Sequence, residues 1–175
     1  MSRLLPQLRI SPPTGPLPPG RGFYQLEESA LYVPIGISDP SPFFSYLESD
    51  TVRFDINQKG QLLFIEIDAG RHTWKVDRTF EGPAGSESAD VRWLDFRSTI
   101  SSPQLLSNRP RTMLHLKFTD ASVARSVQIA EHVVLQITED TRLAGLTVLD
   151  ICDDLAGQEI AKFRASLRKE ISSRL

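Results

Sequence analysis

Residues 52–68 read VRFDINQKGQLLFIEID, and 81 positions later residues 133–149 read VVLQITEDTRLAGLTVL. In the first copy, apolar and polar residues alternate up to the turn-forming run Asn57-Gln58-Lys59-Gly60, and a second β-prone run follows. Each copy is therefore predicted to form a β-hairpin, and the chain is predicted to contain one β unit twice. The aligned pairs that are apolar in both copies are Val52 with Val133, Phe54 with Leu135, Ile56 with Ile137, Leu62 with Leu143, Ile65 with Leu146 and Ile67 with Val148.

Alternation places Val52, Phe54 and Ile56 on one face of the first hairpin, and Leu63 with Ile65 and Ile67 on one face of its returning strand. These side chains are expected to face the core.

Other β-prone runs surround this hairpin. Residues 30–35, ALYVPI, predict a strand, and Pro34 places it at a sheet edge or marks the strand's end. Residues 36–50 are predicted to be a loop whose aromatic side chains plug an open end of a sheet. Further strands are expected at 73–76 and 91–96, with a surface loop at 81–90. The aromatic residues of the first loop are Phe43, Phe44 and Tyr46.

The second unit begins with the run from Met113 to Phe118, in which Met113 is the expected counterpart of Leu31. A long extended stretch follows, in which apolar residues occupy every second position except at Glu131. An acid on the buried face is unfavourable, so a β-bulge at Glu131 is an alternative. Residues 138–142 are then predicted to form the hairpin turn. The apolar residues of the stretch are Val127, Ile129, Val133, Leu135 and Ile137.

The last twenty or so residues have the apolar period of a helix. Apolar residues recur at steps of three and four with Lys and Arg between them, which predicts an amphipathic helix that Asp153 or Asp154 can cap. Its apolar stripe is expected to pack on the chain's own sheet, with docking on a second copy as the alternative. The stripe consists of Ile160, Phe163, Leu167 and Ile171.

These patterns predict an α+β fold that is mainly antiparallel β, with two repeated β-meander units and a C-terminal amphipathic helix. We expect a Pro-rich arm at 1–22, a first unit at 23–100, and a second unit with the helix at 101–175, all within one compact domain. The arm has six prolines, which remove amide donors and predict an extended strap or a mobile tail. Its PxxP spacing matches polyproline ligands, but any proline-rich stretch produces such spacing.

Composition narrows the function classes. Twenty basic and twenty-two acidic residues give a net charge of -2, so no nucleic-acid or anionic membrane partner is expected. Cys152 is the single cysteine, which excludes an intrachain disulfide and favours a reducing, cytoplasmic setting. The chain shows neither a signal-peptide pattern nor an apolar run of the roughly 18 residues that a membrane span needs.

No motif in the chain identifies catalytic, cofactor-binding or metal-binding residues, and no cofactor is expected. His72, His115 and His132 stand apart in sequence without a metal-binding spacing, and the last two fall within predicted strands. Potential ligands are densest at Asp150, Cys152, Asp153 and Asp154, which a strand end meeting a helix start already explains. A lone cysteine there is expected to be a small core residue.

The runs ALYVPIG, VRFDINQKGQLLFIEI and MLHLKFTDASVARSVQIAEHVVLQITEDTRLAGLTVLDI resemble the small bacterial and archaeal proteins grouped as domain of unknown function 2283. That family has one glycine at the hairpin turn and one in the closing strand. The second copy has Thr141 in place of the turn glycine, and the first has Phe64 in place of the strand glycine that Gly145 supplies in the second. The resemblance implies a β fold and no functional residues. Some members look like partners in toxin and antitoxin gene pairs, which points toward protein binding.

We therefore expect a non-enzymatic binding or assembly protein that acts through protein-protein contacts, with a protein partner or self-association into a homodimer. A sheet edge or the terminal helix would make the contact. The alternative is a small-ligand-binding protein or an enzyme, with a pocket between the two repeats lined by Phe43, Phe44 and one or more histidines.

Overall fold

The chain folds mainly into short β-strands, as its alternating apolar pattern predicts. A computed structural model describes residues 5–37, 42–80, 82–83 and 85–174, with the side chains of 167–174 excepted. The elements are β1 (Leu8–Ser11), β2 (Phe23–Gln25), β3 (Ala30–Pro34), β4 (Phe43–Glu48), β5 (Val52–Asn57), β6 (Leu62–Ile67), the 3-10 helix η1 (Arg71–Thr73), β7 (Lys75–Val76), β8 (Glu87–Ser88), β9 (Asp90–Trp93), β10 (Ser98–Thr99), β11 (Gln104–Ser107), β12 (Leu114–Lys117), β13 (Arg125–Ala130), β14 (Val133–Ile137), β15 (Leu143–Val148), β16 (Cys152–Asp153) and α1 (Gln158–Arg174).

The strands form two seven-stranded sheets and one two-stranded sheet. Sheet 1 has the order β10-β4-β5-β6-β3-β2-β16, and sheet 2 has the order β7-β11-β12-β15-β14-β13-β8. Within each sheet the inner neighbours are antiparallel, whereas the two-residue strands at both edges pair in parallel. Strands β1 and β9 form the small third sheet. The predicted, mainly antiparallel β fold with one C-terminal helix is confirmed.

The two repeated hairpins have the same register. Phe54 lies opposite Ile65 in sheet 1, and Leu135 lies opposite Leu146 in sheet 2. The β-bulge also recurs, because both hairpins shift register at the same point, before Ile56 and its counterpart Ile137. Strand β3 pairs with β6 as β12 pairs with β15, so the likeness extends beyond the hairpins.

The chain ties the two sheets together by exchanging edge strands. The segment after the first hairpin crosses to sheet 2, where it supplies β7 and β8 at opposite edges. The segment after the second hairpin crosses to sheet 1 and supplies β16 at one edge, while β10 covers part of the other. Each sheet is therefore completed by residues from outside its own hairpin unit.

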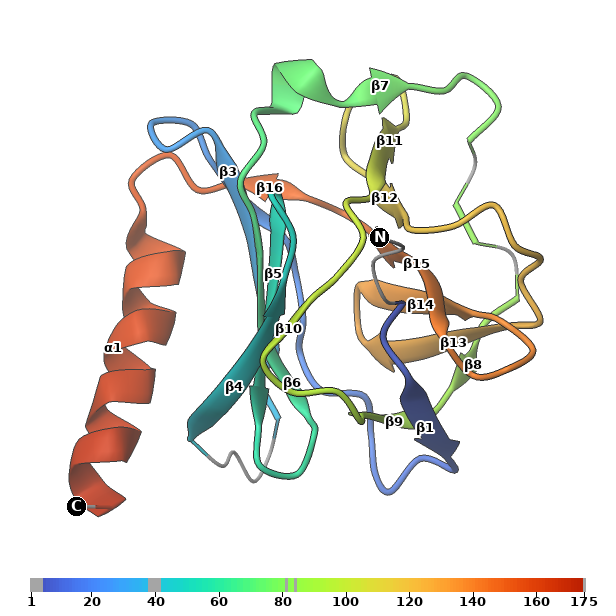
Figure 1. Cartoon of the computed structure of the whole chain (residues 1–175). Coiled ribbons are helices and arrows are strands. Elements are labelled where there is room, and N and C mark those ends of the chain that lie inside the picture. The colour runs from blue at the N-terminus through green and yellow to red at the C-terminus, as the bar shows by residue number, and fades with distance from the viewer. Residues whose placement is uncertain (1–4, 38–41, 81, 84, 175) are drawn as a thin grey trace.

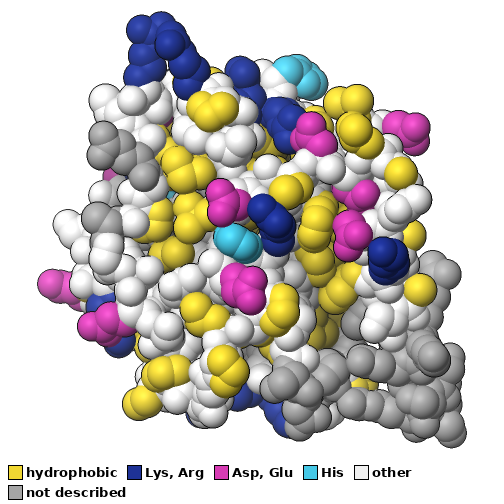
Figure 2. Space-filling model, turned by 180° about the vertical axis from the view of Figure 1, so that it is seen from behind, with side chains coloured by type: hydrophobic (Ala, Val, Ile, Leu, Met, Phe, Trp, Pro, Cys, Tyr) yellow, Lys and Arg dark blue, Asp and Glu magenta, His cyan; other side chains and the backbone are white. Residues whose placement is uncertain are grey.

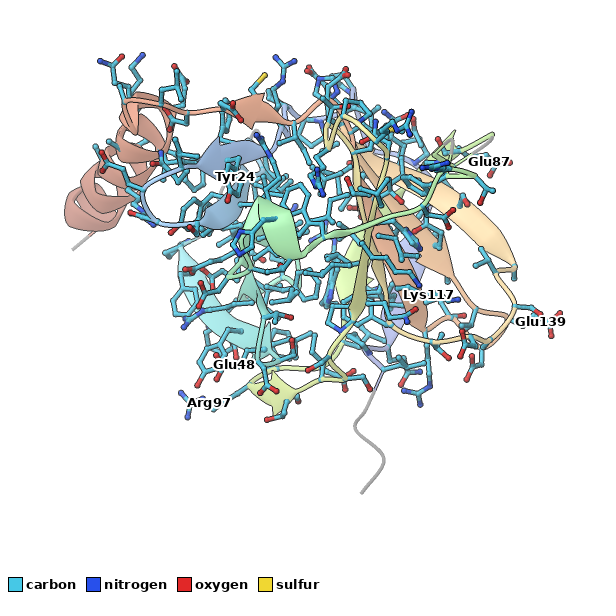
Figure 3. The ribbon with its side chains drawn as sticks, turned by 90° about the horizontal axis from the view of Figure 1, so that it is seen from above. Tyr24, Glu48, Glu87, Arg97, Lys117 and Glu139 are labelled. Carbon is cyan, nitrogen blue, oxygen red and sulfur yellow. The ribbon has the colours of Figure 1, made fainter. Side chains whose placement is uncertain are left out.

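The inner faces of both sheets pack on each other. One hydrophobic cluster contains Phe54 and Ile65 of sheet 1 together with Leu135 and Leu146 of sheet 2, all fully buried. Figure 3 shows the side chains of the two layers filling the space between them. Burial of these apolar faces is the main stabilising contribution in a β-sandwich of this kind.

Helix α1 lies on the outer side of sheet 1, away from sheet 2 (Figure 1). Ile160 is buried and Phe163 is half-buried in a second hydrophobic cluster with Tyr32 and Phe64 of sheet 1. The predicted packing of the helix on the chain's own sheet is thus confirmed for its first turns, whereas the side chains of Leu167 and Ile171 lie outside the described residues. The described part of the chain contains no helix with the length and apolar character that crossing a membrane requires.

The Pro-rich arm is a strap packed against both sheets, at least from residue 5 onward. Leu8 is buried, and its N–H donates to the carbonyl of Thr141 at 2.9 Å. Strand β1 pairs with β9. The sequence did not predict β1, because prolines flank it on both sides. In Figure 1 the blue segment after β1 loops along the lower edge of the molecule before rising to β2. Residues 5–22 are therefore part of the folded body, and the mobile-tail alternative is wrong for them.

Two predictions about the first unit are wrong in detail. Residues 43–48 form β4 and not a loop, since they pair with β5 after the prolines end. The predicted parity also fails at Leu63: Asp55 lies opposite Phe64 and Ile56 opposite Leu62, so Leu63 is the extra residue of the bulge. It consequently packs with the outer cluster near α1.

Strand β3 is a central strand between β6 and β2, with Pro34 at its end, so the sheet-edge alternative is wrong. In the second unit, the expected extended stretch is a tight hairpin. Glu131 and His132 form the turn between β13 and β14, so the acid is exposed there and needs no bulge; the bulge lies at Ile129. Leu114, and not Met113, is the counterpart of Leu31, because it lies opposite Val148 as Leu31 lies opposite Ile67.

Candidate functional site

The histidines that the sequence singles out do not come together. His72 lies exposed in η1, His115 lies in β12, and His132 lies in a turn, not in a strand as predicted. His115 Nδ1 is 2.9 Å from the Thr147 hydroxyl, and burial lowers the pKa of His115. Among the described residues, no three His, Cys, Asp or Glu side chains are grouped closely enough to hold a metal ion.

The acidic cluster around Cys152 divides into separate structural roles. Asp154 caps α1, since its Oδ2 accepts a hydrogen bond from the Ile160 N–H at 3.2 Å. Asp153 forms a salt bridge with Arg71 instead. Cys152 is only half-buried, because β16 lies at the edge of sheet 1, so the expected core position is wrong.

The outer faces of the two sheets differ at equivalent positions. Phe64 of sheet 1 occupies the place that Gly145 takes in sheet 2. Its ring stacks on Phe163 of α1, with the ring centroids 5.4 Å apart, and so anchors the helix. A Cβ on Gly145 would lie 2.8 Å from the His115 ring and 3.1 Å from Gln136 Oε1, so glycine leaves room for these polar side chains. The two positions have diverged because the outer face of sheet 1 carries a helix, whereas that of sheet 2 carries polar side chains.

A cluster of charged and aromatic side chains lies on the outer face of sheet 1. Arg53 Nε donates to Asp55 Oδ1 at 2.8 Å, and the guanidinium carbon lies 4.4 Å from the centre of the Tyr46 ring. Burial raises the pKa of Asp55 although its hydrogen bond with Arg53 works in the opposite direction. Burial also raises the pKa of Glu66, which lies opposite Arg53 on β6. Arg53 is therefore held between a carboxylate and an aromatic ring, an arrangement that fixes its position.

Strand β4 runs beside this cluster at the edge of sheet 1, and part of that edge is open. Strand β10 pairs only with Leu47 and Glu48. Within the described residues, no strand pairs with the stretch from Phe43 to Tyr46 on the side away from β5. Backbone groups alternate in direction along a strand, so part of this stretch presents donors and acceptors outward.

Exposed apolar side chains gather at the same edge. Phe43, Phe44 and Phe96 are 44%, 51% and 38% exposed. The Phe44 and Phe96 rings meet edge to face, with centroids 5.8 Å apart. We call Phe43, Phe44 and Phe96, together with the open stretch of β4, the β4 edge site. Figure 3 shows the charged side chains of Glu48 and Arg97 beside β10, which covers the other end of β4.

The equivalent edge of sheet 2 has a different character. Strand β8 pairs there with Val127 and Gln128 as β10 pairs with β4. The next residues toward the open end are Ser126 and Arg125, and Arg125 forms a salt bridge with Glu87 at 3.5 Å. A charged side chain at an exposed edge discourages strand addition, whereas aromatic side chains favour contact. The edges of the two sheets thus have the same strand pairing, but one carries exposed aromatic side chains and the other carries a charged one.

Phe43 and Phe44 therefore lie at an exposed sheet edge, and not in the pocket between the repeats where the alternative hypothesis placed them with the histidines. On the opposite view of the molecule, acidic and basic side chains are scattered singly or in small groups between hydrophobic ones (Figure 2).

The β4 edge site was missed in the sequence because Pro40 and Pro42 indicated a loop. The β-prone run FFSYLE directly after them was the signal that could have revealed it.

No protein-family model matches this chain, and no curated protein matches it significantly. The resemblance to domain of unknown function 2283 stays a prediction.

Proposed function

We propose that this protein is a non-enzymatic protein-binding module that takes up a short extended segment of a partner protein along the β4 edge site. The observation that carries the proposal is the open stretch Phe43 to Tyr46 with exposed aromatic rings beside it. Addition of a strand to a sheet edge gives affinity through main-chain hydrogen bonds, and neighbouring apolar side chains give selectivity. The single cysteine supports a cytoplasmic setting as part of this proposal.

The size of the site favours a partner segment over a stable dimer. With about 200 Å² per aromatic side chain, the three phenylalanines offer roughly 270 Å² of exposed apolar surface. A second copy in the same contact would double this to about 540 Å², below the roughly 1,200 Å² of a stable interface. A short segment needs no more than this, because its backbone adds hydrogen bonds along β4.

The side chains around the site define the partner's chemistry. The register of β4 against β5 shifts at Phe44, which limits the added strand to a short pairing. An apolar residue of the segment would pack on Phe44 and Phe96, whose edge-to-face contact already fixes both rings. The partner is therefore a short, β-prone segment with at least one large apolar side chain.

Peptide selection followed by titration tests the proposal. Short random peptides would be selected on the immobilised protein, and a selected peptide would be titrated by fluorescence anisotropy. Phe44→Lys should weaken binding at least about tenfold, because it places a charge on the anchoring ring position. Val123→Lys is the matched control, since Val123 is 50% exposed but precedes β13 in sheet 2, and it should leave affinity unchanged.

Equal binding by the Phe44→Lys variant would overturn the proposal. Sedimentation of the protein alone provides a second test. A concentration-dependent dimer that the Phe44→Lys substitution abolishes would also overturn the proposal, because a second copy would then occupy the edge.

A further inference from the structure

Two neighbouring turns at one end of sheet 2 carry arginines, at the opposite end of the molecule from the start of β4 (Figure 1). Strand β7 pairs in parallel with β11, and the Asp77 N–H donates to Ser107 O at 2.9 Å, so both strands enter their turns side by side. The first turn closes where the Phe80 N–H donates to Asp77 O at 3.1 Å. The second closes where the Arg111 N–H donates to Asn108 O at 3.1 Å.

These arginine turns, residues 77–80 and 108–111, present three guanidinium groups without a partner in the described part of the chain. Five other arginines each form an ion pair with an acid: Arg53, Arg71, Arg92, Arg125 and Arg142. In contrast, no ion pair or hydrogen bond among the described residues engages the side chains of Arg78, Arg109 and Arg111. Like charges repel, so this uncompensated cluster costs free energy that the fold itself does not recover.

The local charge is strongly positive. Asp77 is the only acid within the arginine turns, and its Oδ1 accepts hydrogen bonds from the Thr79 N–H at 3.0 Å and the Thr79 hydroxyl at 2.7 Å. Lys75 in β7 and the three arginines give four positive charges against this one negative charge, a net charge of +3. Figure 2 shows Lys and Arg side chains gathered at the upper end of the molecule, the end at which Figure 1 places β7 and β11.

The second turn is held rigidly. Asn108 Oδ1 accepts hydrogen bonds from the N–H groups of Thr112 at 2.9 Å and Met113 at 3.0 Å, and Asn108 Nδ2 donates to the Thr112 hydroxyl at 2.9 Å. Pro110 further restricts the backbone between the two arginines of this turn. Arg111 Nε is buried and has no hydrogen-bond partner among the described residues. The turn therefore holds a partly desolvated guanidinium in place before any ligand binds, which lowers the cost of binding an anion.

We propose that the arginine turns bind the phosphate group of a phosphorylated side chain on a partner protein. A phosphate monoester carries roughly two negative charges and three strong acceptor oxygens, which suits several guanidinium forks, whereas a carboxylate can occupy only one fork. Recognition of phosphorylated segments by arginine clusters is a recurring mode of peptide binding.

Two observations favour this ligand over other anions. Arg78 and Arg109 are exposed, so the site would hold the phosphate itself and enclose little of a free small molecule. A nucleic-acid backbone requires a longer series of phosphate contacts than two turns offer, and the chain's net charge of -2 does not attract it. The proposal does not depend on the β4 edge site, because the two sites share no residue.

Fluorescence anisotropy tests the proposal with the full chain and a labelled peptide in which glycines flank one phosphoserine. The phosphopeptide should bind saturably, and at least about fivefold more tightly than the same peptide with glutamate in place of phosphoserine. Arg109→Gln should weaken phosphopeptide binding about fivefold, as expected for one charge-assisted contact at the surface, and the exposed position makes the change compatible with folding. Arg109→Lys keeps the charge but lacks the fork, so it should recover only part of the affinity.

Arg97→Gln is the matched control. Arg97 is exposed, has a φ of 51° close to the 56° of Arg111, and lies beside β10, outside the arginine turns (Figure 3). This variant should leave phosphopeptide binding unchanged, whereas Arg111→Gln should weaken it as Arg109→Gln does. The comparison separates a contact at the turns from the general effect of removing one positive charge.

Several results would overturn the proposal. Absence of saturable binding would do so, and so would equal affinity for the phosphoserine and glutamate peptides. An equal loss of affinity in Arg97→Gln and Arg109→Gln would show that the turns make no specific contact. Tighter binding of the free phosphate ion, or of a short oligothymidylate, than of the phosphopeptide would show that the ligand is a small anion or a nucleic acid instead.

Discussion

The two hairpin turns provide a quantitative test of how the repeat diverged. Gly60 and Thr141 occupy equivalent turn positions, and both have left-handed backbones, with φ of 78° and 63°. The hydrogen bonds also match, since Gly60 N–H donates to Asn57 O at 3.0 Å and Thr141 N–H to Thr138 O at 3.1 Å. The missing glycine therefore does not alter the geometry of the second hairpin, but a β-branched residue carries the strain there.

We expect opposite results from substitutions at these two positions. A Cβ on Gly60 would lie 2.5 Å from the carbonyl oxygen of Trp93, whose N–H donates to Gly60 O at 2.7 Å. Gly60→Ala should therefore cost about 1–2 kcal/mol for the left-handed backbone and about 1 kcal/mol for the disturbed hydrogen bond, or about 2–3 kcal/mol together. Thr141→Gly should relieve strain of about 1–2 kcal/mol and lose part of it to the greater entropy of glycine in the unfolded chain, a net gain of roughly 0.5–1 kcal/mol.

The assay is urea unfolding followed by the fluorescence of the two buried tryptophans, Trp74 and Trp93. Gly85→Ala is the control, because Gly85 has a φ of 63° and open space around its Cβ position, so it should lose only the backbone contribution of about 1–2 kcal/mol. The reasoning is refuted if Gly60→Ala costs no more than Gly85→Ala, or if Thr141→Gly lowers the free energy of unfolding.

Three further predictions concern the outer faces of the sheets. Phe163→Ala should remove the stack on Phe64, which costs about 1 kcal/mol. Hydrogen exchange in α1 should then become about tenfold faster, while exchange in β14 stays unchanged. Equal effects on α1 and β14 would contradict a locally docked helix. Glu66→Gln should be more stable than the unmodified chain at neutral pH. Burial raises the folded-state pKa of Glu66 above 4.5, so the glutamate's stabilising contribution is present below that pH and lost as the pH rises; equal stability in urea unfolding at pH 7 would count against this. His115 should titrate in NMR with a midpoint below 6.5, because burial lowers its pKa. The stability that depends on its neutral form should fall as the pH falls through that midpoint. A midpoint above 6.5 would contradict its burial.

The sequence predicts the centre of each sheet well and its edges poorly. Alternation from Val52 to Ile56 and its recurrence at Val133 identify the paired hairpins, because the buried face of a strand fixes its side-chain pattern over several residues. Edge strands such as β7, β8, β10 and β16 have two residues each, too few for any period to appear. Their exchange between the sheets depends on contacts far apart in the chain, which local patterns do not contain.

Turn and bulge positions account for most of the remaining errors. The extra residue at Leu63 reverses the parity that simple alternation predicts, and the turn at Glu131 and His132 has neither glycine nor proline to mark it. The sequence predicts that the rings of Phe43 and Phe44 plug an open end of a sheet, but their exposure depends on how far β10 extends along β4. The candidate site therefore required the structure, whereas the repeat that builds its sheet did not.

Amide hydrogen exchange along β4 tests the proposed function most directly. In the free protein, the outward amides between Phe43 and Tyr46 should exchange quickly, because no described strand pairs with them. The amides of Leu47 and Glu48 should be protected, because β5 and β10 pair with that end of β4 on its two sides. Addition of a selected peptide should slow exchange in the stretch from Phe43 to Tyr46 and leave the equivalent edge at Arg125 and Ser126 unchanged. If the bound peptide instead protects amides elsewhere and those from Phe43 to Tyr46 still exchange quickly, strand addition at the β4 edge site is wrong.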